Sequence, residues 1–303
     1  MTVTFPNVRV GQPIRHEGLS VFPLFGDAAS TVDYRLSDAA IADESLLVKE
    51  VSESGSVPDL LVENKGDIRV LFIEGEELIG AKQNRVLNAS VLIAAHSTTK
   101  IPVSCVERGR WGYRSRDFKP SGSHVPSKLR RTLKSSVSRS IQEGEGYLSD
   151  QGEVWREVDC LHCAHGVESG TAAMSDAFEA HQDRVAEFRE KLTYVEGAQG
   201  VAVAIEGRVA TVDLFDKPDT CQKVWDRLLS GVAFDAIEAG AAQATVEVKD
   251  VEQYLAGAVD LPWSQTEAVG EGDEYRAESR QGDHASALAF QDTMVHGSVL
   301  AGV

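Results

Sequence analysis

Two short polar motifs carry the residue types that could bind an anion or move a proton. The first covers residues 74–85 and reads EGEELIGAKQNR, and the second covers residues 107–111 and reads ERGRW. Each follows an apolar run with the length and composition of a β-strand, and the end of a strand can hold a side chain rigidly while its head group stays accessible. We therefore expect a polar site at the rim of a sheet.

The basic and amide residues of these motifs could bind a phosphate or carboxylate. A guanidinium group suits a bidentate anion contact, and the ring of Trp111 could stack on a base. The alternatives are a solvated turn paired with nearby glutamates, and a tryptophan that anchors the core. The predicted ligand-binding residues are Lys82, Gln83, Asn84, Arg85, Arg108, Arg110 and Trp111.

Acidic residues in the same motifs could act as a general acid and base, because neighbouring carboxylates shift one another's pKa values. Glu76 and Glu107 are the predicted catalytic pair, and a divalent metal held by such carboxylates is a possible cofactor. Strand alternation would place Glu74 and Glu76 on one face and Glu77 on the other. Ion pairing with the adjacent lysines and arginines explains the same residues without catalysis.

The segment Cys160–His165 (CLHCAH) invites a zinc interpretation, because paired cysteines with nearby histidines resemble a ligand set. A structural zinc site needs a second, separated ligand pair, and Cys105 and Cys221 are isolated. We expect a helix with buried thiols and predict no metal there.

The elements that must position these motifs alternate in type along the chain. Apolar runs at 70–73, 91–95 and 101–106 are rich in β-branched residues and predict strands. The predicted fold is α+β, with an antiparallel β-sandwich or partial barrel as its core. We expect one domain, with a β-rich core at 1–111, a basic loop at 112–148, a helical segment at 149–194, and a hairpin, a helix and C-terminal strands at 195–303.

Composition limits the classes of partner. The 303 residues carry a net charge of −17, which disfavours general binding to nucleic acid or acidic membranes. Ten lysines and arginines nevertheless lie between 108 and 139, as a solvated loop or an anion-binding surface. The few cysteines fit a reducing compartment, and no apolar run is long enough to span a bilayer, so we expect a cytoplasmic protein with no membrane partner.

The motifs EGEELIGAKQNR and IPVSCVERGRW resemble those of the ARG and rhodanese-phosphatase-superfamily-associated protein family, where ARG stands for ADP-ribosylglycohydrolase. The hairpin GVAVAIEGRVATVDLF, the helix around Trp225 and the closing VHGSVL extend the resemblance over most of the chain. The resemblance implies a nucleotide or NAD-derived ligand and transfers no catalytic residues.

These observations lead to one functional hypothesis and two alternatives. The first is a protein that processes or senses a nucleotide, ADP-ribose or another NAD-derived ligand, with a phosphate-bearing small molecule as its partner. The alternatives are a non-catalytic module that docks a protein partner or a second copy of itself, and a nucleic-acid-binding protein that uses residues 108–139. The sequence leaves open whether the protein is an enzyme.

Overall fold

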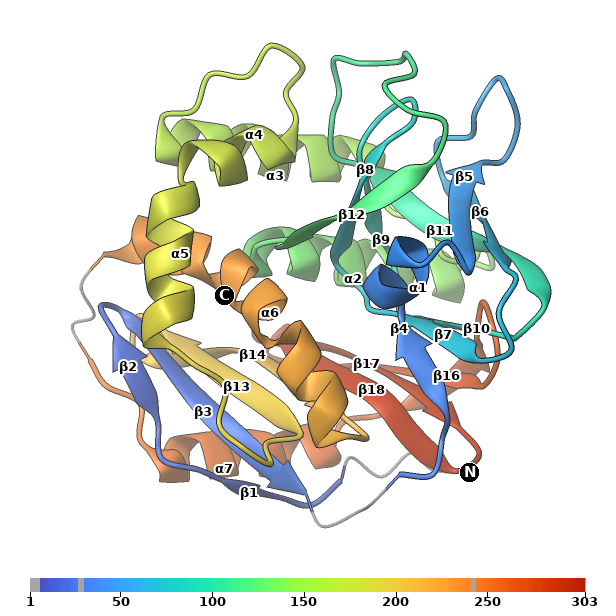
Figure 1. The fold of residues 1–303 in the computed structure, drawn as a ribbon. Coiled ribbons are helices and arrows are strands. Elements are labelled where there is room, and N and C mark those ends of the chain that lie inside the picture. The colour runs from blue at the N-terminus through green and yellow to red at the C-terminus, as the bar shows by residue number, and fades with distance from the viewer. Residues whose placement is uncertain (1–5, 27–29, 241–243, 303) are drawn as a thin grey trace. The chain divides into compact units, whose positions relative to one another are not determined.

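The structure of the protein is a computed structural model that describes residues 6–26, 30–240 and 244–302. The chain divides into two compact units. Unit 1 contains Met1–Val32, Asp183–Glu267 and Gly272–Val303, and unit 2 contains Asp33–Gln182 and Ala268–Glu271. Figure 1 shows the elements of both units in chain order, and each unit is described by itself.

Unit 2 contains a six-stranded and a three-stranded sheet. Their strand orders are β12-β8-β9-β11-β6-β5 and β10-β7-β4. The strands are β4 (Tyr34–Leu36), β5 (Leu46–Glu50), β6 (Asp59–Asn64), β7 (Arg69–Phe72), β8 (Glu76–Gly80), β9 (Arg85–Leu87), β10 (Val91–Ile93), β11 (Ser97–Cys105) and β12 (Phe118–His124). The helices are α1 (Ser37–Ala42), α2 (Ser127–Gln142), α3 (Gln151–His165) and α4 (Met174–Ala180).

The core of unit 2 follows from strand alternation. Every second residue of β5 and β6 is buried, so that Leu46 and Val48 pack with Leu60 and Val62 in one apolar cluster. Pairing is antiparallel except between β4 and β7, which run parallel. The six-stranded sheet contains β8, β9 and β11. The first motif runs from just before β8 to the first residue of β9, and the second motif follows β11.

The prediction of a basic loop over residues 112–148 is wrong for two elements, β12 and α2. Helix α2 buries Leu129, Leu133 and Val137, which are spaced four residues apart and lie on one helical face. Arg130 and Lys134 are also buried on this helix, whereas the sequence predicted either a solvated loop or an anion-binding surface. Both cations form ion pairs with Glu74, the first residue of the first motif, and a sequence pattern does not show such a long-range pairing.

Unit 1 is built on a nine-stranded antiparallel sheet. The main path is β1-β3-β13-β14-β18-β17-β16-β15, and β2 pairs with β3. The strands are β1 (Val8–Val10), β2 (Ile14–His16), β3 (Leu19–Gly26), β13 (Gly200–Ile205), β14 (Arg208–Phe215), β15 (Ser264–Glu267), β16 (Asp273–Glu278), β17 (His284–Phe290) and β18 (Thr293–Leu300). The helices are α5 (Gln182–Lys191), α6 (Pro218–Ala239) and α7 (Val248–Val259).

One face of the unit 1 sheet packs against α7 in an apolar cluster. Phe22, Val212 and Val299 from three strands pack with Val251 and Leu255 of α7. Helix α7 begins at Val248. A capping box between Glu247 and Asp250 starts the helix there.

The predicted α+β class with antiparallel sheets is confirmed. The hairpin expected around Gly207 is present as β13 and β14, and the helix around Trp225 is α6. Within the described residues, no helix combines the length and the apolar character needed to cross a bilayer.

Candidate functional site

The turn between β8 and β9 brings the two predicted motifs together. Its residues Lys82, Gln83 and Asn84 are buried, and the guanidinium of Arg110 reaches the turn from the second motif. Arg110 Nη1 donates to the carbonyl oxygen of Ala81 at 2.6 Å, and Nη2 donates to Asn84 Oδ1 at 3.2 Å. Arg110 therefore clamps one motif to the other.

Glu107 lies against the same clamp and is fully buried. Arg110 donates to both of its carboxylate oxygens, at 2.8 and 2.6 Å, while the Asn84 amide and the Thr171 hydroxyl donate at 3.0 Å each. Burial pushes the pKa of Glu107 upward, but these hydrogen bonds and the charge of Arg110 outweigh it, and the net pKa lies below the ordinary value. Glu107 is held as a carboxylate.

Glu77 has the opposite protonation behaviour. It is 2% exposed, and burial raises its pKa from 4.5 to about 7. The Ser121 hydroxyl offsets part of this rise, although neither carboxylate oxygen meets a described donor in good hydrogen-bond geometry, and the charges of Glu107 and Asp176 add to the rise. Glu77 can therefore hold or release a proton near neutral pH.

The two remaining glutamates of the first motif occupy separate environments. Glu74 accepts from Lys134 Nζ at 2.7 Å and from Arg130 Nε at 3.3 Å, with all three side chains at most 3% exposed. Glu76 accepts from the Ser37 hydroxyl at 2.7 Å and from the Ile73 amide at 3.0 Å. Gly75, at φ 85°, turns the chain between them. The carboxylates of Glu74, Glu76 and Glu77 thus have different partners.

Arg85 lies on the opposite face of the sheet from Glu77, since Glu77 pairs with Val86 while Arg85 pairs with Leu78. Its side chain is 0% exposed. It donates to Gln83 Oε1 and to Cys105 Sγ at 2.9 Å each. Burial raises the pKa of the Cys105 thiol to about 11, despite the opposing charge of Arg85, so Cys105 stays protonated at neutral pH.

Two exposed aromatic rings stand beside the cations of this face. Trp111 is 49% exposed and Tyr113 is 54% exposed. The Lys82 ammonium lies 5.3 Å from the Trp111 ring centroid and 5.1 Å from that of Tyr113, and the Arg85 guanidinium carbon lies 5.6 Å from the Trp111 ring. These are cation–π distances, so each ring contacts a cation. About half of each aromatic side chain is still exposed to solvent.

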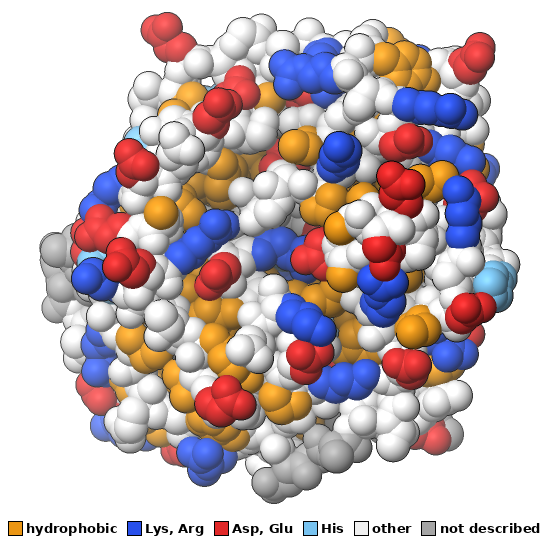
Figure 2. Space-filling model, viewed as in Figure 1, with side chains coloured by type: hydrophobic (Ala, Val, Ile, Leu, Met, Phe, Trp, Pro, Cys, Tyr) orange, Lys and Arg blue, Asp and Glu red, His pale blue; other side chains and the backbone are white. Residues whose placement is uncertain are grey.

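Tyr113 also lines an open cleft of about 860 Å³ in unit 2. Hydrophobic side chains lie next to basic ones at the top of the view in Figure 2, over the loop that joins β11 to β12. The cleft presents both signs of charge, so a ligand with a single anionic group would meet cations flanked by carboxylates. Its lining residues are Lys49, Glu50, Ser52, Glu53, Tyr113, Arg114, Ser115, Arg116 and Asp117.

The predicted site residues fall into two groups and two outliers. The first group is Lys82, Gln83, Arg85 and Trp111, which are joined by a hydrogen bond and by cation–π contacts and reach the cleft through Tyr113. The second group is the clamp of Asn84, Glu107 and Arg110. Arg108 lies apart, because it is exposed and forms a bidentate pair with Asp159 of α3. Glu76 lies apart with its partner on α1.

Three groups around the site were not among the predicted site residues. Glu77 is one of the acidic residues of the first motif, but the sequence does not show that its side chain is buried. Glu50 comes from a distant strand and approaches Arg85 to 4.0 Å. Tyr113 could have been predicted as a stacking residue, since it follows Trp111 by two residues in a basic segment.

The segment Cys160–His165 forms the last part of α3. Cys160 and Cys163 are exposed, which corrects the expectation of buried thiols. His162 is buried, and its Nε2 lies 2.9 Å from the Ala173 carbonyl oxygen, so this nitrogen is engaged by the backbone.

Comparisons with known proteins identify a family and no individual relative. Neither the curated proteins nor the solved structures gave a significant match. A family model described as the ARG and Rhodanese-Phosphatase-superfamily-associated Protein domain matches residues 7–300. This match confirms the resemblance carried by the two motifs and covers almost the whole chain. The chain therefore belongs to the ARG and Rhodanese-Phosphatase-superfamily-associated Protein family.

Proposed function

We propose that the protein binds a phosphorylated nucleotide-type ligand, of the class of ADP-ribose or another NAD-derived molecule, at the cleft of unit 2. The observation that carries this proposal is the Lys82 ammonium between the exposed rings of Trp111 and Tyr113. Exposed aromatic rings offer a stacking surface for a base, and adjacent cations suit phosphate. The same ligand class is implied by the family resemblance.

The cations that line the cleft support the phosphate half of the proposal. Arg114 and Arg116 are exposed and belong to the same loop as Tyr113. A guanidinium group can contact two phosphate oxygens at once, which gives orientation as well as affinity. Glu50 and Asp117 in the lining oppose simple anion binding, so we expect a ligand that also offers hydroxyl donors, such as a ribose.

The pKa values of Glu77 and Glu107 are those expected of an acid and a base, but neither residue lines the cleft, so they carry no argument that a ligand bound there is processed. Carboxyl groups whose environments push their pKa values apart are a common arrangement for an acid and a base. Glu77 has a pKa near 7, while Glu107 is held ionised by Arg110. Glu76 fits this role less well than Glu77, because both of its carboxylate oxygens accept hydrogen bonds from unit 2.

Replacing Trp111 with alanine is expected to weaken binding of ADP-ribose, NAD or AMP. Loss of one stacked base costs about 1–3 kcal/mol, which is roughly a 5- to 150-fold fall in affinity. Isothermal titration calorimetry measures this directly, and Tyr113→Ala should act in the same direction. Ile68→Ala, which truncates another exposed apolar side chain of unit 2, is the control and should bind normally.

Two results would count against the proposal. One is the absence of binding by any of the three ligands, and the other is equal affinity in the wild type and both aromatic variants. Arg116→Ala extends the test to the phosphate contact, with Arg156→Ala, an exposed cation of α3, as its matched control.

The exposed segment 108–116 favours a second candidate, the docking of an acidic protein partner. In that case Trp111→Ala would disrupt an assembly while no nucleotide binds. Nucleic-acid binding is less favoured, because Arg130 and Lys134 pair with Glu74 inside unit 2 and are not available to a phosphate backbone. Affinity for an oligonucleotide that falls steeply with salt would support that alternative instead.

A further inference from the structure

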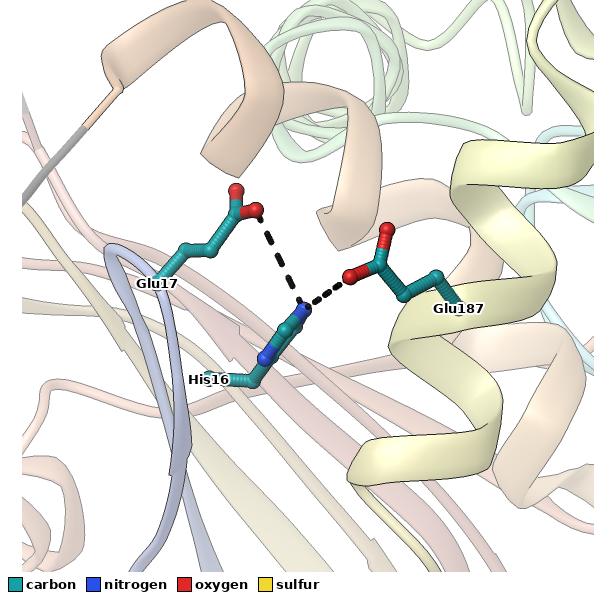
Figure 3. Close-up of side chains that lie close together, drawn as sticks. All are labelled: His16, Glu17 and Glu187. Atoms are coloured by element: carbon teal, nitrogen blue, oxygen red, sulfur yellow. Dashed lines mark ion pairs between the residues drawn. The ribbon is translucent and has the colours of Figure 1, made fainter.

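A cluster of three metal-ligating side chains lies in unit 1, outside the candidate site. His16 ends β2, Glu17 follows it in the hairpin turn to β3, and Glu187 comes from α5. One ligand atom from each residue lies within 4.8 Å of the other two. Figure 3 shows the His16 ring with Nε2 directed toward both carboxylates, at 3.4 Å from Glu187 Oε1 and 4.0 Å from Glu17 Oε1.

These separations approach the spacing of ligands around one ion. Nitrogen and oxygen ligands about 2.0–2.2 Å from a divalent transition metal lie roughly 3–3.5 Å from one another. Because the ligand atoms lie within 4.8 Å of one another, a contraction of at most about 1.8 Å would complete three ligands. The donor set of one imidazole and two carboxylates suits a first-row divalent ion of intermediate hardness.

His16 is held in a position suited to a ligand. Its Nε2 has essentially no solvent exposure and makes no hydrogen bond of good geometry with a described residue. The ring packs edge-on against Phe188, with centroids 4.9 Å apart, and this contact fixes its orientation. Because a buried ring nitrogen normally has a partner, its direction toward two carboxylates is the observation that points to a bound cation.

Arg184 is the main competing cation. Its Nη2 donates to both oxygens of Glu17, at 2.8 and 2.9 Å, and its Nη1 donates to Glu187 Oε2 at 2.6 Å. These bonds leave Glu187 Oε1 directed at His16. Two carboxylates and one guanidinium carry a net charge of −1, so Arg184 positions the carboxylates without fully neutralising them.

We infer that His16, Glu17 and Glu187 form a binding site for a divalent first-row transition ion such as Mn²⁺ or Zn²⁺, with Arg184 as a positioning residue. The site is independent of the proposed nucleotide cleft, because all four residues belong to unit 1. Either proposal can therefore fail without the other.

Titration of the full chain with Mn²⁺, followed by electron paramagnetic resonance of the free ion, tests the site. We expect one Mn²⁺ per chain, and a loss of affinity of about tenfold or more in both His16→Ala and Glu187→Gln. Spin-echo spectra should show a coupled imidazole nitrogen in the wild type and lose it in His16→Ala. Mn²⁺ is the first probe because it binds thiols weakly, whereas Cys160 and Cys163 are exposed.

His96→Ala is the matched control, since His96 is an exposed histidine 2.8 Å from a carboxylate oxygen of Asp67 in unit 2. It should bind Mn²⁺ as the wild type does. Zn²⁺ is then measured by equilibrium dialysis in a Cys160→Ser, Cys163→Ser background. The inference is overturned if the wild type binds neither ion, or if binding survives in both His16→Ala and Glu187→Gln. Circular dichroism identifies a variant that does not fold. If either His16→Ala or Glu187→Gln is unfolded, the Mn²⁺ affinity of the other variant tests the inference.

Discussion

Replacing Glu74 with glutamine is expected to lower the free energy of unfolding by about 3–5 kcal/mol. The substitution keeps the shape of the side chain and removes the charge that faces Lys134 at 2.7 Å and Arg130 at 3.3 Å. Both cations stay buried and lose a counter-charge, which is costly in a low-dielectric interior. Urea denaturation monitored by circular dichroism measures the loss.

A double-mutant cycle separates this charge effect from a general loss of packing. Lys134→Met in the Glu74→Gln background removes one of the two cations that had faced Glu74, so it should recover part of the lost stability. Asp159→Asn removes the carboxylate of the exposed pair with Arg108 and should cost at most about 1 kcal/mol. Similar losses for Glu74→Gln and Asp159→Asn would contradict the assignment of Glu74 as a buried counter-charge.

Replacing Glu77 with glutamine is expected to make the protein more stable than the wild type at alkaline pH. The pKa of Glu77 rises from 4.5 in the unfolded chain to about 7 in the folded one, so the folded state holds the proton more tightly. The stability that this proton contributes is fully present below pH 4.5 and is lost as the pH rises through about 7. A shift of this size corresponds to about 3 kcal/mol.

The pH profile of the difference between variant and wild type gives the test for Glu77. At pH 4.5 the two proteins should unfold at similar urea concentrations, and above pH 7 Glu77→Gln should be the more stable. Glu63→Gln, at a half-exposed position paired with Lys49, should show no such gain. A difference that is constant across this range, or that has the opposite sign, would show that Glu77 does not hold a proton in the folded state.

The sequence predicted those strands and helices whose apolar residues follow a local pattern. Apolar runs rich in β-branched residues predicted the strands of the motif region, and the helix expected around Trp225 is α6. The pattern failed at α2, where Arg130 and Lys134 interrupt an apolar face with charges that are buried. Their burial depends on Glu74, which lies more than 50 residues earlier in the chain. Local periodicity contains no information about such long-range pairing.

In the candidate site too, the sequence predicted which residues come together but did not predict which of them are buried. Sequence analysis placed Arg85 and Arg110 near each other, and both contact the turn at 81–84. It could not show that Arg85 is wholly buried, which means that Arg85→Ala would test the stability of unit 2 before it tested ligand binding. The exposed groups at the cleft, Tyr113 and Arg116, follow the second motif and were outside its apparent limits.

Most of unit 2, residues 33–182, emerges from the ribosome between two neighbouring strands of unit 1. Strand β3 ends at Gly26, and its partner β13 begins at Gly200. At typical elongation rates, about 10–35 s pass between the synthesis of β3 and that of its partner β13, and one edge of β3 is unpaired during this time. Most of unit 2 is synthesised during that interval and can fold. The early strands of unit 1 meanwhile present an unpaired edge to other nascent chains. Chaperone binding during synthesis should therefore concentrate on the first 26 residues.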